Sequence, residues 1–259
     1  MPRFRATLRY DGTAYQGFQR QAPGRPSIQA AVEQAVTEVT GQNAVVIGAG
    51  RTDTGVHATG QVITFAVEWT HEDDALLRAL NVTLPEDIAL SELRRLNKDD
   101  DFHPRYSARA RVYNYTVLQA EVRHPLWRGR AWQVRDALDG EAMNAAAALL
   151  IGTHDCATFG TPPKGDDTVR TIFRSAWTWH ADEAGHLWQY EIAANAFLYR
   201  MVRRIVGMLV DVGRGRRTVS QFEADFRLAR LTPRWTIAPP QGLVLTRVIY
   251  PDDRDAEAF

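Results

Sequence analysis

The segment GAGRTDTGVHATGQV, residues 48–62 of a 259-residue chain, contains the side chains best suited to catalysis. Arg51 and Asp53 stand two residues apart within it. A carboxylate beside a guanidinium stays ionised at neutral pH, because a neighbouring opposite charge favours the charged form. An ionised aspartate held on a turn can act as a nucleophile or stabilise a cationic sugar. The alternative is a structural turn, in which Asp53 bonds its own backbone and Arg51 joins a solvated ion pair.

The four glycines of this segment do not make a nucleotide-binding loop. Asp53 occupies the place of the third glycine of GxGxxG, and the pattern that follows is that of a strand rather than a helix. The glycines instead predict a tight turn and a close approach of a ligand to the backbone. His57 could pair with Asp53 or bind a metal. No third ligand stands at a suitable spacing, so the sequence favours a structural histidine and no metal site.

The composition is that of a soluble globular protein, with 45% hydrophobic and 24% charged residues and a formal net charge of zero. Cys156 is the only cysteine, which excludes an intrachain disulfide and a thiolate metal cluster. No apolar run approaches the roughly 18 residues of a membrane helix. The N-terminus enters a strand pattern without an apolar signal segment, so we expect a cytoplasmic protein with no membrane partner.

Arginines gather between Arg200 and Arg217, where six of them stand against one acidic residue, Asp211. A neutral total built from separated charge blocks can still present a basic face to a nucleic acid. Scattered, solvated arginines are the alternative interpretation of this stretch.

The pattern of residues 1–105 predicts the element order β-α-β-β-α-β, the split arrangement of ferredoxin-like sheets. Alternating apolar and polar residues indicate the strands, and apolar stripes at helical spacing indicate the helices. The expected strands are residues 4–10, 44–48, 61–69 and 88–93, and the expected helices are residues 27–40 and 72–80. This half carries the Asp53 turn.

The acidic stretch NKDDDFHPRYS separates this half from residues 106–259. The second half is expected to carry the strand with Tyr113 and an arginine-rich helix. Both halves mix helices with mainly antiparallel strands, so the expected fold class is α+β. The expected strands of the second half are residues 110–118, 129–134, 170–181, 186–194 and 243–250, and the expected helices are residues 142–152, 197–213 and 219–228.

The motif GRTDTGVHATGQV resembles the active-site motif GRTDAGVHA of the tRNA pseudouridine synthase A family. Further blocks extend the resemblance over nearly the whole chain in the family's order, and the pseudouridine synthase fold is expected with it. The chain has Thr54 where the family usually has alanine, Phe18 where tryptophan is common and Cys156 where phenylalanine is common. The further blocks are YDGTAYQGFQRQ, NVTLPEDI, DFHPRYSARARVYNY, GTHDCATFG, NAFLYRMVRRIVG and PPQGLVLTRVIYP.

The resemblance assigns roles to five residues. It implies that Asp53 is the catalytic aspartate and that Arg203, in MVRRIVG, pairs with it. Tyr113, the first tyrosine of VYNY, is then the residue that stacks on the target uracil. Leu243 lines the base pocket, and Arg51 helps to extrude the target nucleotide or to hold its place.

The resemblance also implies the reaction, which is isomerisation of uridine to pseudouridine in the anticodon stem-loop of tRNA, at positions 38 to 40. The family acts as a homodimer without metal or cofactor, and an isomerisation needs neither a redox partner nor an energy source. Asp53 could attack C1′ of the sugar, add to C6 of the uracil or assist elimination at C2′. Two other functions remain open, a non-catalytic RNA-binding module on the same split sheet and a hydrolase that uses Asp53 with His57.

Overall fold

The computed structural model describes residues 1–22, 24–162, 165–231, 235–254 and 256–259. The chain forms two compact units, Met1–Arg109 with Val244–Glu257, and Ala110–Leu243 with Ala258–Phe259. The sequence placed the division after residue 105 and the closing strand in the second half. In the structure, most of that strand belongs to the first unit, because it pairs with a strand there.

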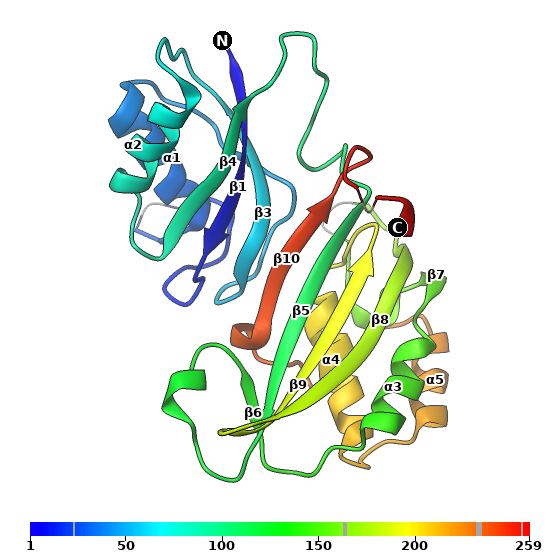
Figure 1. Cartoon of the computed structure of the whole chain (residues 1–259). Helices are drawn as coiled ribbons and strands as arrows, with labels where there is room; N and C mark the ends of the chain where they lie inside the picture. Colours follow the sequence, from blue (N-terminus) through cyan, green and yellow to red (C-terminus); the bar gives the residue numbers. More distant parts are fainter. Residues whose placement is uncertain (23, 163–164, 232–234, 255) are drawn as a thin grey trace. The chain divides into compact units, whose positions relative to one another are not determined.

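The first unit contains the predicted order β-α-β-β-α-β (Figure 1). Strand β1 lies between β3 and β4 and is antiparallel to both. Helices α1 and α2 lie together over one face of this sheet. The elements are β1 (Arg3–Tyr10), α1 (Ile28–Thr40), β2 (Ile47–Gly48), β3 (His57–Ala66), α2 (Asp73–Thr83), β4 (Ile88–Arg95) and β10 (Leu243–Ile249).

Helix α1 follows its sequence signals closely. The Ser27 side chain accepts a hydrogen bond from the Ala30 amide at the first turn, and Gly41 ends the helix in the left-handed conformation with φ 71°. The stripe formed by Ile28, Val32 and Val36 is buried against the sheet, as the helical spacing predicted.

Strand β3 begins earlier than predicted. Residues 57–60 were expected in a turn, yet His57 and Ala58 pair in parallel with Val244 and Leu245 of β10. One edge of β3 pairs with β1. Along the other edge, β10 pairs with His57 and Ala58, and β2 pairs further along with Ile63 and Thr64. A Cβ atom on Gly60 would lie 2.0 Å from the Thr246 carbonyl oxygen, so this glycine admits protein backbone rather than a ligand.

The second unit is built on an antiparallel sheet in the order β5-β9-β8-β7, with β6 added in parallel to β5. Helices α3, α4 and α5 pack together beside it (Figure 1). The predicted α+β class with mainly antiparallel sheets is therefore confirmed. The elements are β5 (Ala110–Gln119), β6 (Trp132–Val134), α3 (Gly140–Ala148), β7 (Gly152–Asp155), β8 (Val169–Asp182), β9 (Gly185–Ala194), α4 (Met201–Gly213) and α5 (Val219–Arg227), with short 3₁₀ turns at Pro125–Trp127, Ala157–Phe159, Pro240–Gly242 and Ala256–Ala258.

Helix α4 starts at Met201, four residues later than the sequence predicted. Arg200 adopts a left-handed backbone conformation with φ 59°, which prevents the preceding residues from continuing the helix. The apolar stripe formed by Met201, Ile205 and Met208 is buried as expected. Among the described residues, no helix is long and apolar enough to cross a membrane.

Candidate active site

The turn between β2 and β3 carries Arg51 and Asp53. Arg51 is exposed, Asp53 is half-buried, and Thr52 between them is buried. The Val56 amide donates to the Asp53 carbonyl oxygen at 3.1 Å, and Gly55 takes a positive φ of 76°, so the chain reverses tightly after the aspartate. The two residues that the sequence selected in this segment therefore share one rigid turn of the first unit.

The loop that follows β1 holds this turn by its backbone. The Phe18 amide donates to the Thr52 carbonyl oxygen at 3.1 Å, and the Gly55 amide donates to the Tyr15 carbonyl oxygen at 3.4 Å. A Cβ atom on Gly12 would lie 2.0 Å from the Val56 carbonyl oxygen. Loop and turn are thus packed backbone to backbone, an approach that only glycine allows at this position.

Buried polar side chains support the turn on its inner side. The hydroxyls of Tyr10 and Thr52 lie 2.8 Å apart. Gln61 is fully buried; its Oε1 accepts from the Gly50 amide at 3.2 Å and its Nε2 donates to the Gly50 carbonyl oxygen at 2.8 Å. Burial raises the pKa of Tyr10 to about 12, although hydrogen bonds with Thr52 and Gln61 act in the opposite direction.

Sequence reasoning missed Tyr10 and Gln61, although one signal was available. Gln61 stands at the start of the alternation that buries Ile63 and Phe65, so it is a polar residue at a core-facing position. A buried carboxamide needs hydrogen-bond partners, and here the backbone of Gly50 supplies them.

His57 connects the turn to the loop after β1. It is buried, and its Nδ1 accepts the Gly12 amide at 3.0 Å and lies 3.1 Å from Asp11 Oδ1. These contacts support the structural role that the sequence favoured for this histidine. Among the described residues, no three His, Cys, Asp or Glu side chains come together as a metal site requires.

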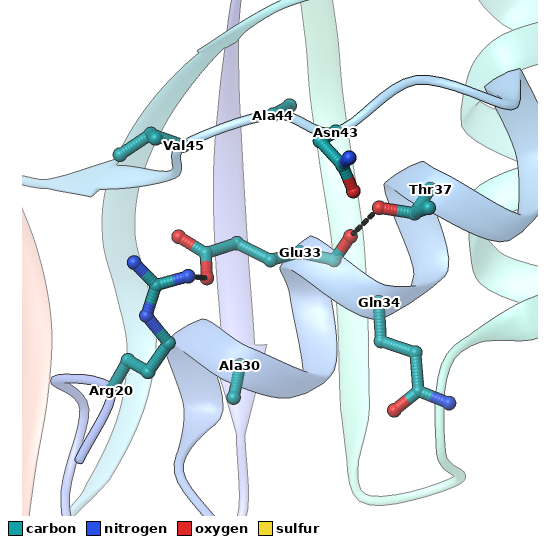
Figure 2. A pocket seen from close by; sticks show the side chains of 8 residues that line it. All are labelled: Arg20, Ala30, Glu33, Gln34, Thr37, Asn43, Ala44 and Val45. Carbon is teal, nitrogen blue, oxygen red and sulfur yellow. Dashed lines mark hydrogen bonds and ion pairs between the residues drawn. The ribbon is translucent and has the colours of Figure 1, made fainter. Parts of the chain in front are cut away.

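Helix α1 joins the same loop to the chain that enters β2. The Glu33 side chain is only 9% exposed; its Oε2 lies 2.8 Å from Arg20 Nη1 and its Oε1 accepts the Val46 amide at 3.0 Å. Figure 2 shows this ion pair beside a pocket of about 340 Å³. None of the residues predicted for the active site lines that pocket. The Glu33 contacts connect the segments that lead to the turn.

In the second unit, Tyr113 lies on β5 opposite Ile192 of β9 and is buried. Its ring meets that of Phe197 edge-on, with 5.1 Å between the centroids and 85° between the planes. Phe197 therefore fixes the orientation of the Tyr113 ring. Leu243, at the start of β10, is buried as well.

Arg203 lies in the first turn of α4 and is half-buried. Its Nε donates to the Ala238 carbonyl oxygen at 2.8 Å, and its own carbonyl oxygen accepts the Ala238 amide at 3.0 Å. Its charge also acts on Tyr115, whose pKa is raised by burial and partly lowered again by the Arg203 charge. The guanidinium is thereby tied to the segment that leads into β10.

Two further positions on the same side of α4 hold this segment. A Cβ atom on Gly207 would lie 2.0 Å from the Thr236 carbonyl oxygen, so only glycine allows this approach. The Thr236 hydroxyl donates to Asp211 Oδ2 at 2.8 Å. Residues 203, 207 and 211 are four apart and therefore share one helix face.

Ion pairs involve part of the arginine cluster between Arg200 and Arg217. Arg214 and Arg216 lie 2.7 Å and 3.4 Å from Asp136 Oδ2, and Arg217 pairs with Asp225. Three of the six arginines thus lie beside carboxylates. The sequence could not predict the two pairs with Asp136, because Asp136 comes from a distant part of the chain.

The predicted site residues divide between the two units, with Arg51 and Asp53 in the first and Tyr113, Arg203 and Leu243 in the second. The model of the tRNA pseudouridine synthase family matches residues 6–107 and 146–251. The chain belongs to this family. The matched ranges include the Asp53 turn and helix α4 with Arg203, whereas Tyr113 lies between them.

Curated relatives extend the family match over almost the whole chain. Proteins named tRNA pseudouridine synthase A from Methylacidiphilum infernorum, Neisseria gonorrhoeae and a Caulobacter species are 38%, 41% and 39% identical to it. The alignments cover 98%, 96% and 96% of this chain and 97%, 92% and 98% of the respective relatives. Membership in the tRNA pseudouridine synthase family makes the protein an enzyme, an isomerase.

Proposed function

We propose that the protein isomerises uridine to pseudouridine in the anticodon stem-loop of tRNA, at positions 38 to 40, with Asp53 as the catalytic nucleophile. The observation that carries this proposal is the Asp53 turn, a half-buried carboxylate on a segment fixed from both sides by hydrogen bonds. Such fixing supports catalysis, because a reacting group must be held in position before the substrate arrives.

The reaction breaks the C1′–N1 glycosidic bond, turns the uracil and rejoins C5 to C1′. A uracil stacked in RNA does not expose these atoms, so the nucleotide must flip out of its stack. Tyr113, held edge-on by Phe197, provides a fixed aromatic face for the flipped base. Leu243 lines the base pocket, and Arg51 holds the place that the nucleotide leaves.

Arg203 is the basic residue that pairs with the Asp53 carboxylate in this proposal. Its guanidinium is fixed by Ala238, so its charge is presented in one orientation. A fixed cation keeps the carboxylate ionised and therefore nucleophilic. The attack on C1′, the addition to C6 and the assisted elimination all need this ionised state. We further propose that the enzyme works as a cytoplasmic homodimer on tRNA, without a small-molecule cofactor.

The test replaces the carboxylate. Asp53→Asn and Asp53→Ala should abolish tritium release from tRNA that carries 5-³H-uridine, whereas tRNA binding should persist. Asp99→Asn, the same exchange at an exposed loop position, serves as the matched control. Near-normal tritium release by either Asp53 variant would overturn the assignment. Release of free uracil by the wild-type enzyme would show hydrolysis instead of isomerisation.

A further inference from the structure

Two exposed residues, Tyr199 and Arg200, lie directly before helix α4. Tyr199 is 50% exposed, and Arg200 beside it is exposed. Their neighbours in the chain, Leu198 and Met201, are both buried. An exposed tyrosine ring offers an aromatic face on which another molecule can stack.

The backbone of Tyr199 is held rigidly. Its amide donates to the Thr161 carbonyl oxygen at 3.0 Å, and its carbonyl oxygen accepts from Arg204 Nη1 at 2.8 Å. A Cβ atom on Gly160 would lie 2.6 Å from that same carbonyl oxygen. An aromatic ring presented on a fixed backbone loses little conformational entropy when it binds a partner.

Arg200 has a left-handed backbone, with φ 59°, a conformation that residues other than glycine rarely adopt. Strain of this kind concentrates at functional positions. Its guanidinium carbon lies 4.8 Å from the centre of the Tyr199 ring. Within the described part of the chain Arg200 forms no ion pair, whereas Arg214 and Arg217 lie beside aspartates. Its charge therefore remains available for an anion.

This pair stands next to the aromatic face assigned to the target uracil. Phe197, whose ring contacts Tyr113, precedes Tyr199 by two residues. Two residues span at most about 7 Å along the chain. An exposed ring beside an uncompensated arginine matches the chemistry of a nucleotide, since the ring stacks on a base and the guanidinium binds a phosphate.

We propose that Tyr199 and Arg200 form a subsite for the RNA nucleotide adjacent to the flipped uridine. The Tyr199 ring stacks on the base of this nucleotide, and Arg200 contacts its phosphate. The placement beside the flipped uridine rests on the proposed role of Tyr113. The stacking and phosphate contacts themselves are tested by RNA binding, which does not depend on whether Asp53 is the nucleophile.

The first test measures the Kd for unmodified tRNA by filter binding. Asp53→Asn is used as the background, so that no substrate is converted. Tyr199→Ala should raise the Kd about tenfold or more, because a stacking contact is lost. Tyr199→Phe keeps the ring and should stay within about twofold of the background. Trp179→Ala, which removes a ring of similar exposure (56%) on β8, should leave the Kd unchanged. A wild-type Kd for Tyr199→Ala, or an equal loss for Trp179→Ala, would overturn the subsite.

The second test separates backbone strain from charge. Glycine adopts the left-handed conformation of Arg200 without strain, so Arg200→Gly should unfold at the same or a higher temperature. If Arg200 meets a phosphate, the same variant should bind tRNA more weakly and lower the slope of log Kd against log salt by about 1. Arg200→Lys should retain that slope. An unchanged Kd and salt slope for Arg200→Gly would show that the arginine is only structural, and the phosphate contact would be withdrawn.

Discussion

Asp53 owes its position to hydrogen bonds made by other residues of the first unit. Gln61 offers one acceptor and one donor to Gly50, as a neighbouring strand would, and thereby fixes the chain three residues before the aspartate. Tyr10 fixes Thr52 in the same buried layer. A reacting group that shifts by about 1 Å can lose about a hundredfold in rate, so these hydrogen bonds bear directly on turnover.

Gln61 therefore provides a test at the residue scale. Gln61→Met keeps the size of the side chain but leaves two half-buried polar groups of Gly50 without these partners, at a cost of at most about 1–3 kcal/mol for each group. We expect lower stability in urea and a lower single-turnover rate, with little change in tRNA Kd. Gln61→Glu keeps the acceptor for the Gly50 amide and, with a protonated carboxyl, the donor to the Gly50 carbonyl oxygen, so it should be less impaired in rate at low pH. Equal rates for the wild type and Gln61→Met would contradict the positioning role.

At the scale of elements, helix α4 organises the second half of the candidate site. Arg203, Gly207 and Asp211 hold the segment at Thr236 and Ala238 along one helix face. This segment then runs into β10, which begins with Leu243. Two of the predicted site residues therefore depend on how closely the segment approaches the helix.

Gly207→Ala tests this approach. Alanine is favoured over glycine inside a helix by about 1 kcal/mol. The added Cβ, however, would lie 2.0 Å from the Thr236 carbonyl oxygen, and a clash of this kind typically costs about 1–3 kcal/mol. We expect a net loss of stability and of turnover, measured by thermal unfolding and tritium release. A variant as stable and active as the wild type would show that the segment moves aside freely.

The elements that local signals define were predicted well from the sequence. Ser27 and Gly41 mark the ends of α1, and the alternation of β1 is read directly from its residues. The misses depend on distant partners. The early start of β3 at His57 requires pairing with β10. The late start of α4 follows from the left-handed backbone of Arg200, a conformation that an arginine in the sequence does not predict.

The same distinction applies to the candidate site. The motif identified the Asp53 turn, whereas its supports, Tyr10, Gln61 and the loop after β1, are non-local contacts that the sequence did not reveal. The roles of Asp53, Arg203, Tyr113, Leu243 and Arg51 remain predictions to be tested by mutation.

At the scale of the whole molecule, equal numbers of basic and acidic residues give the neutral net charge, and part of the arginine charge is paired locally. With Arg214, Arg216 and Arg217 beside carboxylates, fewer arginines of the cluster are available for phosphates than the sequence suggested. If this cluster binds the phosphates of tRNA, the salt response should be shallower than six arginines would give.

The assembly state is a prediction for the complete molecule. We expect a homodimer, so sedimentation equilibrium should give a mass of about twice 29.1 kDa at micromolar protein concentration. Addition of tRNA should raise this mass further. A mass that stays at that of one chain over the whole concentration range would contradict the prediction.

The pairing of β10 with β3 also has a consequence for synthesis on the ribosome. The first unit receives its last strand only after residues 110–243 have been made. At about 5–20 residues per second, this delay lasts roughly 7 to 27 seconds. Meanwhile the edge of β3 beside His57 lacks its partner in the nascent chain, and an open strand edge can pair with other chains. Strand β10 is thus added to the first unit among the last parts of the chain, and a nascent-chain chaperone would be of most use in this interval.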